Sequence, residues 1–173
     1  MLFSNIIGQN EVKGRLINSV RNGRISHAQL FLGQEGAGAL PLAMAYTQYL
    51  LCRNRTEKDS CGQCPSCIKS AKLIHPDVHF VYPIAIKKKE SEISTDVISD
   101  WREAVLENSY LSLSDWFGHL RAENKQPIIS VEESAEILRK LSLTTYEGEF
   151  KIMLIWLPEK MNVQAANKLL KIL

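Results

Sequence analysis

The sequence lacks the features that would place it in a membrane or on the secretory route. No apolar run approaches the roughly 20 residues needed to cross a bilayer. The N-terminus, MLFSNIIGQNE, has neither the basic start nor the apolar centre of a signal peptide. An excess of one charge is also lacking: the formal net charge is +2 at pH 7, which by itself does not indicate nucleic-acid binding. These absences predict a cytoplasmic protein.

The composition is that of an ordinary globular chain. Of its 173 residues, 45% are hydrophobic and 23% are charged. A chain of this length buries roughly 70% of its unfolded surface when it folds as one domain. We therefore expect a single domain over residues 1–173. The sequence stops at Leu173 in mid-helical pattern and without a cap, which predicts a fragment of a longer chain.

A strand, a glycine-rich loop and a helix follow one another in the first third of the sequence. The residues 29–32 suit a strand, an apolar helix runs to about Leu51, and three glycines lie between them: Gly33, Gly36 and Gly38. This order is that of a phosphate-binding loop. In such a loop the glycines let backbone N–H groups surround a phosphate at the N-terminus of a helix.

The loop lacks the side chains that bind a nucleotide in the motif G-x-x-x-x-G-K-[ST]. Gly33 and Gly38 occupy the glycine places, but Ala39 stands at the lysine place and Leu40 at the serine or threonine place. The lysine would contact phosphates and the hydroxyl would ligate Mg²⁺. One charge about 4 Å from a phosphate is worth roughly 4 kcal/mol at an effective dielectric of about 20, or about three decades of affinity. We predict no productive binding or hydrolysis of ATP; an ordinary glycine-rich turn is the alternative.

All four cysteines lie in one polar excursion after the predicted helix. Cys52, Cys61, Cys64 and Cys67 have the spacing C-x8-C-x2-C-x2-C. The two-residue gaps let neighbouring thiolates share one ion, and four thiolates suit tetrahedral zinc. We therefore predict a zinc module over residues 52–67. Its role would be structural, because four protein ligands leave no open position for catalysis.

Other assignments of the four cysteines agree less well with the sequence. Two disulfides conflict with a cytoplasmic protein and with the overlapping two-residue spacings, and four unrelated thiols would not gather within sixteen positions. An iron–sulfur cluster is the alternative that stays open. His75 and His79 could compete as ligands, but beside four cysteines we expect them to be turn and surface residues.

Strands alternate with helices along the rest of the chain, which predicts a parallel sheet and an α/β fold class. Strands are expected at 78–82 and 150–156, and the second is a continuous apolar run typical of a central parallel strand. Asn10 and Asn162 are each expected to cap a helix, and a capping box that starts with Ser130 is expected to open another.

Residues 84–127 differ in residue pattern from the alternating strands and helices around them, and we expect a helical insertion there. The segment contains a charged loop at 87–90, a helix with Trp101, and a short helix that is capped by Ser114 and carries Trp116. The simplest interpretation is a pair of helices that covers a sheet edge. A partner-binding surface around the two tryptophans is the alternative.

Several short segments, taken in order with the four cysteines, form a recognisable combination: 6–9, 27–33, 75–78 and 161–171. Together they resemble the δ′ subunits of bacterial DNA polymerase III clamp loaders, in their N-terminal AAA+ domain. The ordered combination is specific, although no single piece is, and it covers most of the chain outside 84–127. The resemblance implies a P-loop NTPase-like (AAA+) parallel sheet flanked by helices, with a zinc knuckle and a helical insertion.

The resemblance also directs attention to the end of the strand expected at 150–156. In relatives that hydrolyse ATP, this strand is followed by Asp-Glu, which hold Mg²⁺ and polarise the attacking water. Here Trp156 and Leu157 occupy those places, and Glu159 comes two residues too late. Since γ/τ subunits keep a working ATP site and δ′ subunits often do not, the double loss implies a δ′-like subunit that is not an enzyme by itself.

By resemblance, such a subunit is a structural stator in the ring that loads the sliding clamp during DNA replication. The implied partners are γ/τ and δ subunits and, indirectly, the sliding clamp and primer–template DNA. Zinc is implied as a structural cofactor, and no ATP is expected. The lid, the collar and the arginine motif of relatives lie beyond Leu173.

Two other functions stay open at this point. An ATP-hydrolysing γ/τ-like subunit would have to bind nucleotide despite Ala39 and Leu40. A nucleic-acid-binding zinc knuckle would stack bases on aromatic side chains, and no aromatic residue lies between Cys52 and Cys67.

Overall fold

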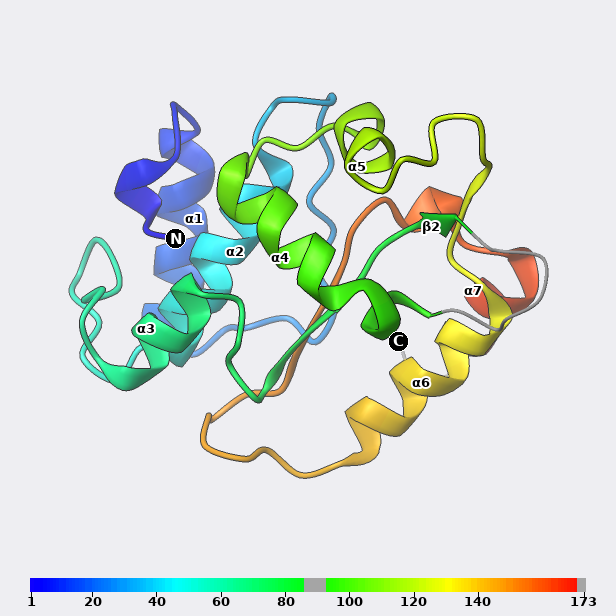
Figure 1. Ribbon diagram of the computed structural model, residues 1–173. Coiled ribbons are helices and arrows are strands. Elements are labelled where there is room, and N and C mark those ends of the chain that lie inside the picture. Colours follow the sequence, from blue (N-terminus) through cyan, green and yellow to red (C-terminus); the bar gives the residue numbers. More distant parts are fainter. Residues whose placement is uncertain (86–92, 171–173) are drawn as a thin grey trace. The chain divides into compact units, whose positions relative to one another are not determined.

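The computed structural model describes residues 1–85 and 93–170 (Figure 1). These residues form two compact units, of which the first comprises Met1–Val78 and Thr145–Ile152 and the second His79–Thr144 and Met153–Leu173. The charged loop predicted at 87–90 lies outside the described residues. Within the described ranges, no helix combines the length and the apolarity that crossing a membrane requires.

Helix α2 is the centre of the first unit. This unit contains η1 (Phe3–Asn5), α1 (Asn10–Arg21), α2 (Ala39–Leu51) and α3 (Pro65–Ala71). Both α1 and α3 contact α2 (Figure 1). Every residue of α2 from Leu40 to Leu51 is buried, because a helix that is apolar on all sides is stable only inside a core. The predicted end of this helix at Leu51 is confirmed.

Left-handed residues flank helix α1 at both ends. The N-cap is Gln9 at φ 55°, and no side chain caps the helix, so the prediction that Asn10 caps it is wrong. At the other end Gly23 has φ 65°, and the amide of Arg24 donates to the carbonyl of Ser19 at 2.8 Å. This is a Schellman ending, which requires a residue that tolerates positive φ.

The strand predicted at 29–32 is not formed. Leu30 and Leu32 are 75% and 89% exposed, while Phe31 packs against Tyr46 with ring centroids 6.2 Å apart. An apolar run becomes a strand only where a neighbour takes up its backbone hydrogen bonds. Among residues 1–85 and 93–170, no strand pairs with this segment.

Two parallel strands confirm the α/β class. Strands β1 (Val78–Val81) and β4 (Ile152–Ile155) are neighbours in one sheet. In the first unit the amide of Ile152 donates to the carbonyl of Asp77, and in the second the amide of Trp156 donates to the carbonyl of Val81, each at 2.8 Å. Because both partners advance by four residues in the same direction, the pairing is parallel.

The second unit has its own core and a short antiparallel pair. In this pair β2 (Ile84–Ala85) joins β3 (Pro127–Ile128), with Ile84 opposite Ile128. The core is formed by Val81, Ile129, Ile137 and Leu169. The other elements are η2 (Ser94–Val97), α4 (Ile98–Glu107), α5 (Leu113–His119), α6 (Val131–Ser142), η3 (Pro158–Lys160) and α7 (Val163–Leu169).

Two of the predicted helix caps in this unit are confirmed. Ser130 accepts a hydrogen bond from the amide of Glu133, and Asn162 accepts one from the amide of Gln164. The reciprocal half of the predicted capping box is wrong. The buried carboxylate of Glu133 instead accepts from the amide and hydroxyl of Ser94, at 2.6 and 2.7 Å. Burial raises the pKa of Glu133 above its ordinary value.

The tryptophans expected in the helical insertion are buried in the second unit. Trp101 and Trp116 are both 0% exposed. Trp101 stacks on Tyr82 with centroids 4.1 Å apart, and the indole N–H of Trp116 donates to the carbonyl of Pro83 at 2.7 Å. An exposed partner surface on these two residues is therefore excluded. Helix α5 is capped by Ser112 rather than by the predicted Ser114.

Candidate functional site

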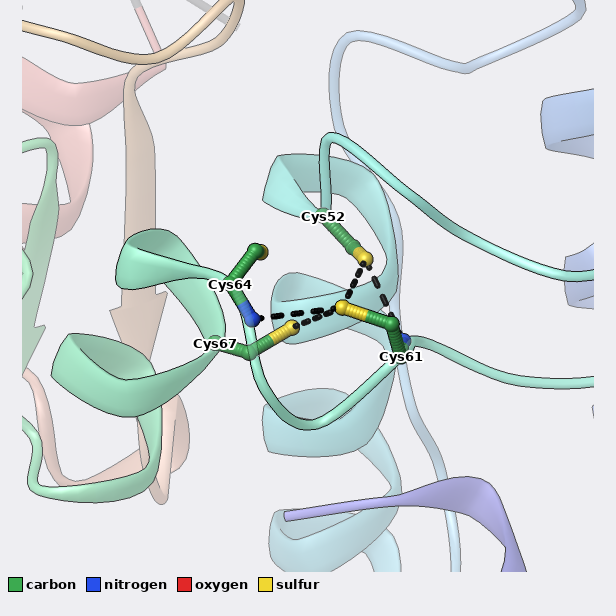
Figure 2. Close-up of side chains that lie close together, drawn as sticks. All are labelled: Cys52, Cys61, Cys64 and Cys67. Carbon is green, nitrogen blue, oxygen red and sulfur yellow. Dashed lines mark hydrogen bonds between the residues drawn. The ribbon is translucent and has the colours of Figure 1, made fainter.

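The four cysteines meet at the junction of α2, a loop and α3. Cys52 is the C-cap of α2, Cys64 is the N-cap of α3 and Cys67 lies within α3, while Cys61 belongs to the loop. All four sulfur atoms lie within 4.8 Å of one another (Figure 2). The Sγ of Cys61 is 3.5 Å from that of Cys52 and 3.9 Å from that of Cys67. The structure brings all four predicted ligands together.

The geometry of the sulfur cluster fits a tetrahedral metal ion. Zinc–sulfur bonds of about 2.3 Å place tetrahedral ligands about 3.8 Å apart, close to the distances found here. The cysteines are free thiols, not disulfides. The amide of Cys61 donates to the sulfur of Cys52 and the amide of Cys64 to the sulfur of Cys61, both at 3.3 Å. Four sulfur donors with such amide contacts could hold a borderline-soft ion such as zinc.

Hydrogen bonding and burial act differently on the individual thiols. Backbone amides of Gln63 and Cys64 lower the pKa of Cys61 to about 6. Burial raises the pKa values of Cys52 and Cys67. Only thiolates are metal ligands, so an ion bound here would displace protons from the buried sulfurs.

A turn at residues 146–148 is fixed by the carboxylate of Asp77. One carboxylate oxygen accepts from the amide of Tyr146, and the other accepts from the amides of Glu147 and Gly148 at 2.9 and 2.7 Å. A Cβ atom on Gly148 would lie 2.8 Å from Leu51 Cδ2 and 3.2 Å from Asp77 Oδ2. A side chain at this position would therefore have to displace its neighbours, which favours glycine.

His75 begins the predicted turn, in which the amide of Val78 donates to the carbonyl of His75 at 3.1 Å, but the expectation that it is a surface residue is wrong. The residue is only 3% exposed, and it does not belong to the sulfur cluster. The amide of Asp77 donates to His75 Nδ1 at 3.2 Å, so Nε2 carries the ring proton. That N–H faces Ser66 Oγ at 2.8 Å and Glu147 Oε1 at 3.3 Å. In this tautomer His75 is a donor to Ser66 and not a base for it.

Asp77 holds the turn together and Glu147 attaches it to the cysteine-bearing segments; neither role was predicted from the sequence. Their contacts join residues about seventy positions apart, and such pairs leave no local spacing pattern. The one available signal was Gly148, because an isolated glycine before an apolar strand indicates close backbone approach.

The glycine loop has the backbone of a turn and a pocket without cationic side chains. Gly36 has φ 77° and Gly38, the N-cap of α2, has φ 88°. Leu40 is buried in the core, whereas Gly33 and Gly36 are exposed. The pocket of about 210 Å³ beside the loop is mainly apolar, and no lysine or arginine among the described residues lines it. Its lining is Gln9, Val12, Leu16, residues 29–33, residues 37–39 and Leu42.

At the end of β4, in the second unit, an aromatic side chain takes the place of a carboxylate. Trp156 packs against Trp101 with ring centroids 5.3 Å apart. Leu157 adopts a left-handed conformation, φ 54°, as the N-cap of η3. Neither residue can ligate a metal or accept a proton, and Glu159 lies in η3, beyond both.

Comparison with known proteins shows similarity to bacterial replication subunits. DNA polymerase III subunit delta′ of Bacillus subtilis is 33% identical over 85 residues, which cover 49% of this chain and 26% of that protein. Subunit delta′ of Escherichia coli is 31% identical over 97 residues, 56% of this chain and 28% of that protein. DNA polymerase III subunit tau/gamma of Haemophilus influenzae is 31% identical over 65 residues, 38% of this chain and 9% of that protein.

These pairwise matches span about a quarter of the length of the two delta′ relatives. The match to a protein family is longer and covers residues 8–173. The chain therefore belongs to the family described as DNA polymerase III, delta subunit, and its α/β fold is of the P-loop NTPase-like (AAA+) class.

Proposed function

We propose that this chain is a δ′-like subunit of the DNA polymerase III clamp loader that acts as a structural stator and does not hydrolyse ATP. One observation carries the proposal: the groups that would bind phosphate and metal are absent both from the glycine loop and from the end of β4. Ala39 and the buried Leu40 stand beside the glycine loop, and Trp156 and Leu157 stand at the end of β4. A pocket without a lysine or a metal ligand has little to attract a magnesium-bound triphosphate.

We also propose that Cys52, Cys61, Cys64 and Cys67 hold a structural zinc ion. The proposal is supported by the close spacing of the four sulfurs and by the amide groups that point at two of them. Four sulfur ligands would complete a tetrahedral shell and leave no position for substrate or water.

The proposed organisation is an N-terminal AAA+ domain over residues 1–173, with the zinc module at 52–67 and a helical insertion at 84–127. The proposed partners are the γ/τ and δ subunits of a cytoplasmic clamp loader, and through them the sliding clamp and primer–template DNA. Delta′ and tau/gamma relatives both carry polymerase III subunit names, which supports a place in that assembly.

Calorimetric titration of the purified, zinc-loaded protein with MgATP tests the proposal, with phosphate release measured in parallel. We expect no heat of binding at millimolar nucleotide and no turnover. A second measurement mixes the protein with γ/τ and δ subunits and follows co-elution as one complex. Co-elution without nucleotide binding by this subunit supports the stator role.

A γ/τ-like, ATP-hydrolysing subunit is the second candidate, because tau/gamma proteins are also among the relatives. Micromolar MgATP binding accompanied by turnover would establish it and remove the δ′ assignment. Binding without turnover would leave the stator role intact, but would show that loop backbone alone suffices to hold a nucleotide.

A further inference from the structure

Glu147 contacts both of the cysteine-bearing segments in the first unit. Its carboxylate accepts from Lys69 Nζ at 2.6 Å, and its backbone carbonyl accepts from Arg53 Nη2 at 3.2 Å. Arg53 directly follows Cys52, and Lys69 lies in α3 close behind Cys67. The turn at 146–148 therefore touches the same two segments that a metal ion bound to these cysteines would join.

A buried polar chain strengthens this attachment. Ser66 Oγ is 2.8 Å from His75 Nε2, which in turn is 3.3 Å from Glu147 Oε1. The His75 side chain is fully buried, and that of Glu147 is 20% exposed. The Glu147 Oε1 atom is itself buried and forms no hydrogen bond with the described residues, although His75 Nε2 approaches it to 3.3 Å. Breaking the buried Ser66–His75 contact would leave polar groups without a partner, which is costly, so the two segments are expected to separate together.

The attachment continues from the turn into the start of strand β4. The carboxylate of Asp77 binds three consecutive amides of the turn, and its carbonyl accepts from the amide of Ile152 at 2.8 Å. A displacement of the turn therefore has to disturb the first hydrogen bond between β1 and β4.

We propose that Glu147 is a positioning residue of the metal knuckle, which couples metal binding to the order of the turn at 146–148 and the start of β4. The inference rests on the proposed metal site. Glu147 and the metal ion would hold the same two segments. Each therefore lowers the conformational entropy that these segments still have to lose when the other one binds. By thermodynamic linkage, the turn strengthens metal binding by the same factor by which the metal stabilises the turn.

The experiment compares Glu147→Gln with Glu149→Gln in the full protein. The control removes a carboxylate from an exposed neighbour in the same segment. Zinc affinity is measured by competition with a chelating dye, and amide exchange at 146–152 is measured with zinc and after chelation. We expect Glu147→Gln to weaken zinc binding about tenfold, the size typical of groups that support metal ligands, and Glu149→Gln to leave it unchanged.

The unmodified protein provides a test that does not depend on a variant folding. Chelation is expected to speed amide exchange at 146–148 and at Ile152, as well as within 52–67. A milder variant, Lys69→Gln, removes only the bond to Glu147 Oε2 and is expected to weaken zinc binding severalfold.

Two results overturn the proposal in distinguishable ways. Unchanged exchange at 146–152 after chelation, with faster exchange confined to 52–67, would show that zinc is bound but that the turn is independent of it. Absence of stoichiometric zinc binding by the unmodified protein would remove the metal site and with it this inference, while the absence of ATP binding would remain a separate question.

Discussion

The cysteine knuckle at 52–67 and the glycine loop at 33–38 are two irregular segments of one unit, at opposite ends of helix α2. In the knuckle the side chains carry the chemistry, and three of the four cysteines are buried. In the glycine loop only backbone groups could bind a phosphate, and Gly33 and Gly36 are exposed. Both segments thus have the backbone conformation of a binding loop, but only the knuckle also has a complete set of side-chain ligand atoms.

The difference shows that a loop conformation and a binding site are separate properties. Gly36 and Gly38 still adopt the left-handed conformations that a tight loop before a helix needs. The pocket next to them contains no positive charge among its described lining residues. The knuckle, by contrast, places four sulfurs at distances that one ion can span.

Metal removal gives the largest expected effect and tests the knuckle side of this comparison. Chelation, or Cys64→Ser, is expected to unfold residues 52–67 and loosen the attached turn, while α1 and the core of α2 persist. Structural zinc contributes about 10–16 kcal/mol of apparent binding energy in peptide knuckles. Residue-resolved hydrogen exchange measures the result. Cooperative loss of α1 and α2 together with the knuckle would contradict this division.

Placing a lysine at position 39, where the motif G-x-x-x-x-G-K-[ST] has one, tests the glycine-loop side of the comparison. Ala39 lines the pocket, so Ala39→Lys is expected to raise affinity for MgATP by up to about three decades, equivalent to roughly 4 kcal/mol. Turnover is not expected, because Trp156 and Leu157 supply no carboxylate. Calorimetry measures binding, and Ala39→Gln controls for side-chain length. Equal, negligible affinity in both variants would show that the loop backbone itself is unsuited to phosphate.

Gly148→Ala probes the turn that joins the knuckle to β4. The added methyl would meet Leu51 Cδ2 at 2.8 Å and Asp77 Oδ2 at 3.2 Å, so we expect a loss of about 1–3 kcal/mol in unfolding free energy. Gly14→Ala is the matched control, since Gly14 lies inside α1 and a methyl group added there would meet nothing within 4 Å. The control should gain up to about 1 kcal/mol. Urea denaturation measures both, and equal effects would argue against the close contact.

Substituting Asp77 is expected to cost about as much as Gly148→Ala, and in addition to change the acid sensitivity of the protein. Burial raises the pKa of Asp77, but the amides of Tyr146, Glu147 and Gly148 together lower it below its ordinary value of 3.8. A lowered folded-state pKa gives stability that is present above the unfolded pKa and is lost as the pH falls through the folded pKa.

Asp77→Asn should therefore lose about 1–3 kcal/mol at neutral pH, because one or more turn amides lose their acceptor. The difference in unfolding free energy between this variant and the unmodified protein should become smaller as the pH falls below about 4. Urea unfolding at several pH values measures the difference. If this difference in unfolding free energy stayed constant down to the pH at which the protein unfolds, the charge of Asp77 would not be what stabilises the turn.

The sequence was most informative where local chemistry decides the structure. The four-cysteine spacing, the apolar helix α2 and the caps Ser130 and Asn162 all depend on residues close in the chain, and the structure places them as predicted. Parallel pairing of β1 and β4 followed from the alternation of strands and helices.

Predictions were wrong where the local structure depends on a contact with a residue far away in the sequence. Glu133 bonds Ser94 instead of closing its own capping box, and His75 is buried by a network that includes Glu147. Residues 29–32 have the composition of a strand but no strand partner within the described parts of the chain. Local patterns carry no information about such partners, because the contacts are formed only when the chain has folded.

The packing of Trp156 against Trp101 also limits how easily a metal site could arise at the end of β4. Replacing Trp156 by aspartate would remove an indole from an aromatic cluster and place a charge against the fully buried ring of Trp101. A site for phosphate and metal would require changes at Ala39, Leu40 and Leu157 as well. The aspartate by itself is therefore expected to lower stability without supplying a complete site, so the aromatic packing opposes the first carboxylate that such a site would need.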